Sequence, residues 1–152
     1  MSEAEKKLNE LGIVLPEVPK PVANYVPWVR SGNQLYVSGQ LPLKDGKLLH
    51  TGLTGEGVST DEAKSCARQC AINIIAVANN AVGLSNVRRV VKLVGFVACP
   101  ASFTGQPGVI NGASDLLAEV FGEAGRHARS AVGVGSLPLN APVEIEAIFE
   151  VA

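Results

Sequence analysis

Aromatic residues are scarce in this chain of 152 residues, which has four Phe, two Tyr and one Trp. The hydrophobic core must therefore be built from Val, Ile, Leu and Ala. The two histidines are not spaced with the three cysteines for a closed zinc site, and an odd number of cysteines does not suggest a disulfide framework. We predict no metal. We interpret Cys66 and Cys70 as small core residues of a helix rather than as a metal or redox pair.

Long apolar runs and blocks of one charge are also missing. The longest apolar runs, Ala71–Ala78 and Leu93–Ala98, are far too short to cross a bilayer, and the charged N-terminus has no apolar signal segment. We therefore expect a cytoplasmic protein without a membrane partner. The net charge is −1 with no cluster of Lys and Arg, so nucleic acid is an unfavourable partner.

The composition is that of a folded protein, with 47% hydrophobic and 18% charged residues. The length fits one domain with a real core, and we predict a single domain over residues 1–152. Within it, residues 1–21 are expected to form an N-terminal helix, capped by Ser2 and ended by Gly12, followed by a proline-containing connector.

Hydrophobic periodicity predicts two longer helices. The first opens at a capping box from Ser59 to Glu62 and ends at Gly83, and the second runs from about Gly108 to Phe121. Alternating or continuous apolar patterns predict strands at residues 24–29, 35–40, 87–98, 128–134 and 143–151. This order predicts an α+β fold in which the two helices pack on one face of a mixed sheet. The other face carries Val and Ile, so we expect self-association to cover it.

A glycine-rich stretch at Gly52, Gly55 and Gly57 allows two interpretations. Glycine lets backbone amides approach an anion, as in a phosphate cradle. The stretch matches no known glycine fingerprint, however, and a surface loop is favoured.

Two charged residues near the end of the chain are candidates for a small-anion site. Arg129 and Glu144 lie on strands that we interpret as an adjacent closing pair. An arginine can hold a carboxylate in two parallel hydrogen bonds, and a glutamate can orient or deprotonate water. Taken alone, Arg129 is more simply an ordinary solvated strand residue, and Glu144 is also compatible with the polar face of a strand. His127 is either a base near this site or a surface histidine.

The residues around this pair resemble a known family. Arg129–Val132, followed fifteen positions after the arginine by Glu144–Ile148, is similar to the signature of the RidA family (YjgF-like, reactive intermediate deaminase). Upstream, Asn24–Val26 resembles the family's Pro-Tyr segment, and Leu35–Gln40 resembles its second strand. Asn111 corresponds to the Asn of the family's second helix. The resemblance covers roughly residues 22 to 152.

The resemblance implies a chorismate-mutase-like fold assembled as a homotrimeric barrel, with clefts between the subunits. Members with this arginine hydrolyse 2-imino acids such as 2-iminopropanoate, the tautomers of enamines, to 2-keto acids and ammonia. They use no metal or organic cofactor. Some relatives carry the label endoribonuclease L-PSP, but RNA cleavage or translation inhibition has poor support in a chain of net charge −1.

Mapped onto this chain, the resemblance implies that Arg129 clamps the substrate carboxylate and Glu144 positions the attacking water. The implied substrate-binding residues are Tyr25 (from the adjoining subunit), Ser38, Gly39, Asn111 and Ala131.

Ala131 replaces the family's usual Cys, but only the backbone of this residue is needed. The departures that favour a second possibility, a non-catalytic trimer that binds a carboxylated metabolite and signals or regulates, are Pro27-Trp28 and the altered loops. Pro27-Trp28 is a bulky change after the tyrosine segment. The N-terminal helix, the loop at Gly52–Gly57 and the insertion at Ser102–Pro107 lengthen the chain.

Overall fold

The structure, a computed structural model, describes residues 1–18 and 24–152. Its main element is a five-stranded mixed sheet in the order β1-β2-β7-β5-β6. The strands of this sheet are β1 (Trp28–Ser31), β2 (Gln34–Gln40), β5 (Val87–Ala98), β6 (Ala128–Val134) and β7 (Val143–Val151). Two-residue strands β3 (Leu43–Lys44) and β4 (Lys47–Leu48) form a separate hairpin.

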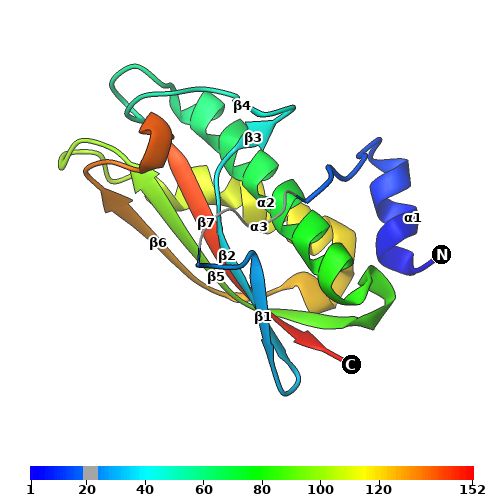
Figure 1. Cartoon of the computed structure of the whole chain (residues 1–152). Coiled ribbons are helices and arrows are strands. Elements are labelled where there is room, and N and C mark those ends of the chain that lie inside the picture. Colours follow the sequence, from blue (N-terminus) through cyan, green and yellow to red (C-terminus); the bar gives the residue numbers. More distant parts are fainter. Residues whose placement is uncertain (19–23) are drawn as a thin grey trace.

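Helices α2 (Thr60–Val82) and α3 (Gln106–Phe121) lie side by side on one face of the sheet, and α1 (Glu3–Glu10) packs beyond them against α3 (Figure 1). The predicted α+β fold with two helices on one face is therefore confirmed. Ser2 caps α1 as predicted. Residues 19–21 of the predicted connector lie outside the described residues.

Both long helices follow from local sequence signals. The capping box of α2 is present in full, since Ser59 Oγ accepts from the Glu62 amide and the Glu62 carboxylate accepts from the Ser59 amide. The helix ends at Gly83, which has a φ of 80°. Helix α3 begins at Gln106, two residues before the predicted start, because Pro107 fits a first helical turn that needs no N–H donor.

The core lies between these helices and the sheet. Strand β7 alternates as predicted: the side chains from Val143 to Val151 at odd positions are buried, whereas Glu146 and Glu150 are exposed. Cys66 and Cys70 of α2 are fully buried in the same core, which confirms their interpretation as small core residues. Burial raises the pKa of the Cys66 thiol to about 11 and that of the Cys70 thiol well above its usual range, so both are protonated and unreactive.

Two strand predictions were wrong. The first strand begins only at Trp28, since Pro27 has no N–H and offers its carbonyl oxygen to the Ser38 amide. More importantly, β6 and β7 are not neighbours. Strand β5 lies between them, parallel to β6 and antiparallel to β7. This central position explains why the sequence of β5 is almost continuously apolar: the strand has a neighbour on each side and helices cover one of its faces.

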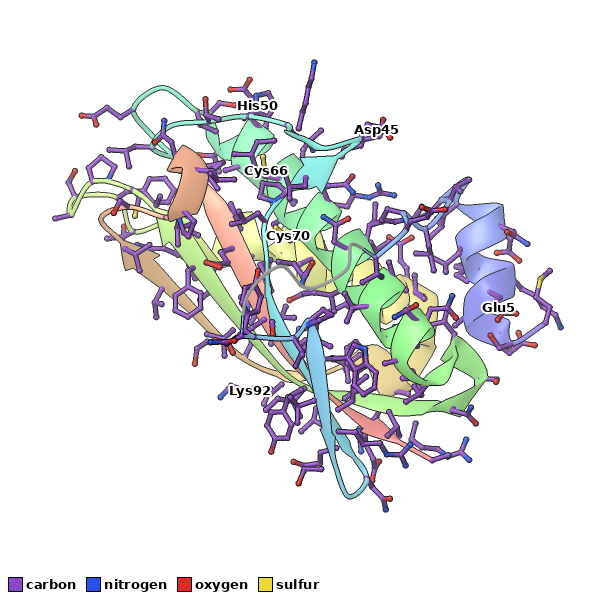
Figure 2. All side chains as sticks on the ribbon, viewed as in Figure 1. Glu5, Asp45, His50, Cys66, Cys70 and Lys92 are labelled. Atoms are coloured by element: carbon purple, nitrogen blue, oxygen red, sulfur yellow. The ribbon has the colours of Figure 1, made fainter. Side chains whose placement is uncertain are left out.

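The sheet face opposite the helices is apolar at its centre and bears charges around it. The side chain of Ile148 faces away from the core, and the strand registers show which residues share this face. They are Tyr36, Lys92 (labelled in Figure 2), Val94, Phe96, Val132, Glu144, Glu146 and Ile148. Tyr36 on β2 and Val132 on the edge strand β6 are each 43% exposed, which is high for large apolar side chains.

Candidate functional site

Arg129 projects from edge strand β6 towards helix α3. It is in register with Leu93, which is fully buried under the helices, so Arg129 lies on the helix-covered face. Its Nη1 donates to Asn111 Oδ1 at 2.7 Å and to Ser114 Oγ at 3.2 Å. Within the described residues, Nε and Nη2 have no hydrogen-bond partner. These two nitrogens form a planar fork that matches the two oxygens of a carboxylate.

A hollow of about 290 Å³ lies beside this guanidinium. Asn111, Ser114, Arg126 and His127 are among its lining residues. We call Arg129, Asn111, Ser114 and His127 the arginine half of the candidate site. Ala131 follows on the same face of β6, and the outer backbone edge of this strand is free of a sheet partner in the described part of the chain.

Glu144 lies on the opposite face of the sheet, against strand β2. The registers of Val37 with Ala147 and of Gln40 with Ile145 leave one extra residue in β2, which is a β-bulge at Ser38 and Gly39. The Glu144 carboxylate lies over Gly39, where a Cβ would be only 2.7 Å from Oε2. Gly39 is therefore the residue that makes room for this carboxylate.

Ser38 and Tyr25 complete this second region, but in a different way from the prediction. The Ser38 hydroxyl donates to the carbonyl oxygen of Val26 at 2.6 Å, so it ties down the segment that carries Tyr25. Its hydrogen is not available to a ligand in this arrangement. The Tyr25 side chain is 64% exposed and free of the core. We call Glu144, Ser38, Gly39 and Tyr25 the glutamate half of the site.

One chain does not bring the two halves together. Glu144 is in register with Phe96 and Arg129 with Leu93, and residues three apart on one strand face opposite sides. The two side chains are also two strands apart, about 10 Å across the sheet. Arg129 is joined to Asn111 within one chain, whereas the predicted action of Arg129 and Glu144 on one small substrate needs a second copy of the chain.

The environment of Glu144 makes it a stronger base than a solvated glutamate. Desolvation raises the pKa of its carboxyl above the usual range, and the charge of Glu146, two residues along the same face, raises it further. A higher pKa increases the affinity of the carboxylate for a proton near neutral pH.

The glycine-rich loop does not have the amides that a phosphate cradle requires. The amides of Gly52, Thr54, Gly55, Glu56 and Val58 all donate to backbone carbonyl oxygens. The structure thus favours the surface-loop interpretation. Phe103, from the predicted insertion, packs on Gly55, so the two segments that lengthen the chain contact each other.

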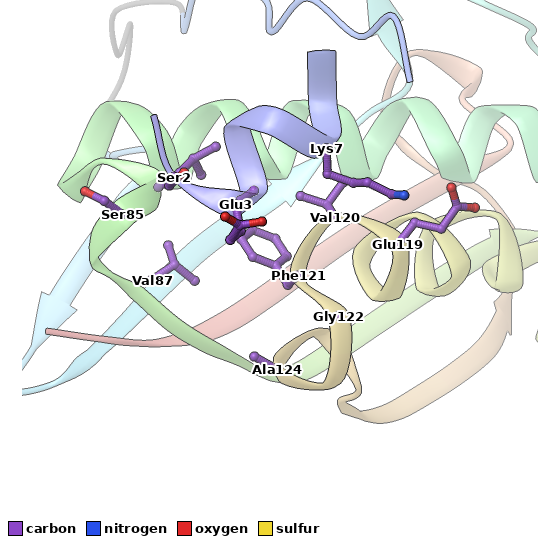
Figure 3. Close-up of a pocket in the computed structure, with 12 residues that line it drawn as sticks. Ser2, Glu3, Lys7, Ser85, Val87, Glu119, Val120, Phe121, Gly122 and Ala124 are labelled. Carbon is purple, nitrogen blue, oxygen red and sulfur yellow. The ribbon is translucent and has the colours of Figure 1, made fainter. Parts of the chain in front are cut away.

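Two further features lie away from both halves. His50, which is labelled in Figure 2, has its Nδ1 3.3 Å from a carboxylate oxygen of Glu62 at the start of α2. A larger hollow of about 460 Å³ lies between α1 and the end of α3, with Glu3, Lys7 and Glu119 among its lining residues (Figure 3). Lys7 already pairs with Glu10 at 3.3 Å, and among residues 1–18 and 24–152 no second cation lines this hollow.

Neither a metal cluster nor a membrane span is found in residues 1–18 and 24–152. No group of three His, Cys, Asp or Glu side chains in this part of the chain could hold a metal ion. No helix there is both long and apolar enough to cross a bilayer.

Sequence reasoning named Asn111 but missed Ser114, the second partner of Arg129 on its own side of the sheet. Ser114 was not singled out, and His127 was left between two interpretations. The available signal was helical spacing: Asn111 and Ser114 are three residues apart, and therefore share one face of α3.

A mixed sheet of this order, with two helices on one face and a half-buried arginine on its edge strand, defines a chorismate-mutase-like α+β protein. Residues 5–150 match the family model described as "YjgF/chorismate mutase-like, putative endoribonuclease". The chain belongs to this YjgF/RutC/RidA family.

Several relatives cover nearly the whole chain. Protein TCP17 of Trypanosoma cruzi is 50% identical over 94% of this chain and 91% of its own length. The 2-iminobutanoate/2-iminopropanoate deaminase of Dermatophagoides farinae is 35% identical over 90% of this chain and 92% of its own. Among solved structures, Atu1372 of Agrobacterium tumefaciens, a protein of unknown function, has a TM-score of 0.93 and 53% identity, covering 99% of this chain and 93% of its own.

Proposed function

We propose that the protein hydrolyses small 2-imino acids, such as 2-iminopropanoate, to 2-keto acids and ammonia. The observation that carries this proposal is the state of Arg129: Nη1 is held by Asn111 and Ser114, and the Nε–Nη2 fork is open beside a small hollow. Such a fork recognises the carboxylate that every 2-imino acid carries. The deaminase from Dermatophagoides farinae, a relative along nearly all of the chain, supports this substrate class.

The site is completed by a neighbouring subunit in a homotrimer. Arg129 of one subunit holds the carboxylate, and the glutamate half of the next subunit faces the imine carbon. Tyr25, which is exposed in one chain, lines the cleft, and backbone groups at Gly39 and Ala131 contact the substrate. Covering the apolar sheet face in the same assembly removes the exposed Tyr36 and Val132 from water.

The proposed reaction needs a positioned water and one proton carrier. Glu144 accepts a proton from the water as its oxygen bonds to the imine carbon, and the C=N electron pair moves to nitrogen. The carboxyl then returns this proton to nitrogen, which gives a carbinolamine. The carboxylate next carries the hydroxyl proton to the amino nitrogen, the C–N bond breaks as the C=O bond forms, and ammonia leaves with a keto group in its place. An imine carbon is already electrophilic, so orientation and a placed base supply most of what the step requires. No cofactor takes part in the proposed steps.

A non-catalytic carboxylate-binding trimer is the second candidate. The observation in its favour is that the arginine half is complete within one chain, whereas the placement of the water depends on a second subunit. Such a protein binds a small 2-keto acid but does not accelerate hydrolysis.

The decisive experiment follows 2-keto acid release from an imine generated in situ by a serine dehydratase. The wild type is expected to accelerate release, Arg129→Ala to abolish the acceleration, and Arg129→Lys to restore little of it, since an ammonium lacks the fork. An Arg129→Ala variant as fast as the wild type would contradict the proposal. Binding of pyruvate without any acceleration would favour the non-catalytic candidate.

A further inference from the structure

Within the arginine half, His127 is connected to Arg129 through Ser114. The half-buried imidazole has Nδ1 2.7 Å from the carbonyl oxygen of Gly125 and Nε2 2.9 Å from Ser114 Oγ. A carbonyl oxygen can only accept a hydrogen bond, so Nδ1 carries the proton. In the neutral ring Nε2 is then an acceptor, and the Ser114 hydroxyl donates to it.

The proton on Nδ1 therefore sets the direction of each hydrogen bond in the series that joins Arg129 to His127. Since the Ser114 hydrogen points to His127, the lone pairs of its oxygen are free for the Arg129 Nη1–H at 3.2 Å. The order of donation is Arg129 to Ser114, Ser114 to His127, and His127 to Gly125. Without the histidine, the serine hydroxyl is free to rotate and its hydrogen can turn towards the guanidinium. Hydrogen bonds that polarise one another in sequence are also stronger than isolated ones.

We propose that His127 is a positioning residue for the substrate carboxylate: acting through Ser114, it fixes the guanidinium of Arg129 so that the Nε–Nη2 fork faces the hollow. This inference rests on the proposed function of the same site. Arg126 also lines the hollow, but its guanidinium pairs with Glu123 at 3.6 Å. Among the described residues, only Asn111 and the serine–histidine pair hold Nη1 in place.

The test is a double-mutant cycle on His127→Leu and Ser114→Ala, read by the KM for 2-iminopropanoate and by calorimetry with pyruvate. Each single variant should raise KM and the pyruvate Kd about threefold to tenfold, the value of one hydrogen bond, with little change in kcat. If His127 acts through Ser114, the double variant should be no worse than Ser114→Ala alone.

Two glutamine variants distinguish a positioning effect on Arg129 from a general loss of structure. In His127→Gln the side-chain oxygen can accept the serine proton, so most of the affinity should return. His50→Gln makes the same chemical change at the other histidine, which contacts Glu62, and should leave both constants unchanged. Additive losses in the double variant, or an unchanged Kd in His127→Leu, would overturn the inference.

A readout that needs no substrate keeps this inference separate from the proposed function. Nitrogen-15 relaxation of the Arg129 Nε–H should show a rigid group in the wild type and a mobile one in both single variants. If the wild type neither turns over imine nor binds pyruvate, the proposed function fails, but this measurement still decides the positioning role. Equal mobility in the wild type, His127→Leu and Ser114→Ala would refute it.

Discussion

The Glu144 carboxylate lies over the backbone of Gly39 at the β2 bulge, so close that a Cβ on residue 39 would be 2.7 Å from Oε2. A glycine at this position therefore decides where the proposed base can be. The contact joins a bulge, which sets the backbone, to the side chain whose pKa is raised by desolvation.

Replacing Gly39 with alanine tests this relationship. Gly39→Ala should push the carboxylate away from the proposed water position and lower kcat about tenfold or more, because small displacements of a catalytic group are costly. The change in unfolding free energy should stay within about 1 kcal/mol, since the displaced atoms are the end of a flexible side chain. Gly57→Ala is the matched control, because a Cβ there meets nothing within 4 Å. Unchanged turnover in Gly39→Ala would separate Glu144 from catalysis.

Mixing two inactive variants tests whether the halves come from different subunits. In a one-to-one mixture of Arg129→Ala and Glu144→Gln, three quarters of randomly assembled trimers are mixed, and each has one intact site of three. The mixture should therefore recover about a quarter of wild-type activity after unfolding and refolding together. Kinetics of the remixed and separately refolded samples give the comparison. Failure to recover any activity, with mixed trimers present by mass spectrometry, would place both groups in one subunit's site.

The raised pKa of Glu144 predicts opposite effects of pH on activity and stability. Turnover needs the ionised carboxylate, so kcat/KM should fall as the pH drops through this raised pKa. Burial penalises the ionised form of the folded state, so its cost to stability is present at neutral pH and is lost as the pH falls through the same pKa. Glu144→Gln should accordingly be slightly more stable than the wild type near pH 7.

Substitution of the neighbouring Glu146 tests what raises the pKa of Glu144. Glu146→Gln removes the charge that adds to the desolvation effect and should move the acid limb of the pH–rate profile to lower pH. Glu150→Gln, four residues further along the same exposed face, should leave the limb in place. A limb that does not move in Glu146→Gln would assign the shift to desolvation alone.

The packing of α2 against α3 depends on Gly112. A Cβ on this residue would be 2.1 Å from the carbonyl oxygen of Lys64, which is backbone and cannot move aside cheaply. Gly112→Ala should lower the unfolding free energy by about 1 to 3 kcal/mol. Gly108→Ala, one turn earlier with nothing within 4 Å, should be neutral or stabilise by up to about 1 kcal/mol through helix propensity. Urea denaturation of both variants measures the difference, and equal stability would contradict the close contact.

Local patterns in the sequence predicted most elements but not how the strands are ordered. The bounds of β5, β6 and β7 agree with the alternating and continuous apolar patterns. The position of β5 between the other two did not follow from them, because a strand's side chains report the burial of its faces and not the identity of its neighbours. Arg129 and Glu144 were therefore predicted on adjacent strands, whereas β5 separates them. The registers of β6 and β7 with β5 also place the two side chains on opposite faces of the sheet.

The candidate site was predictable where a charged residue has a fixed spacing, and not where a neutral residue acts through another. Arg129 and Glu144 stand out by charge and by family resemblance. Ser114 belongs to the arginine half only because its hydroxyl lies between a guanidinium and an imidazole, a relationship that depends on how α3 packs on β6. The role of Ser38 likewise became apparent only through its bond to Val26.

The two buried thiols of α2 can be used to measure local opening of the structure. Cys66 and Cys70 are fully buried and protonated, so an aqueous alkylating reagent reaches them only when the packing around α2 opens. The alkylation rate of these two cysteines, followed by peptide mass spectrometry, therefore measures how often the packing around α2 opens, and no engineered probe is needed. Comparing that rate in the presence and absence of pyruvate measures whether filling the cleft slows the openings, even in a variant that has lost turnover.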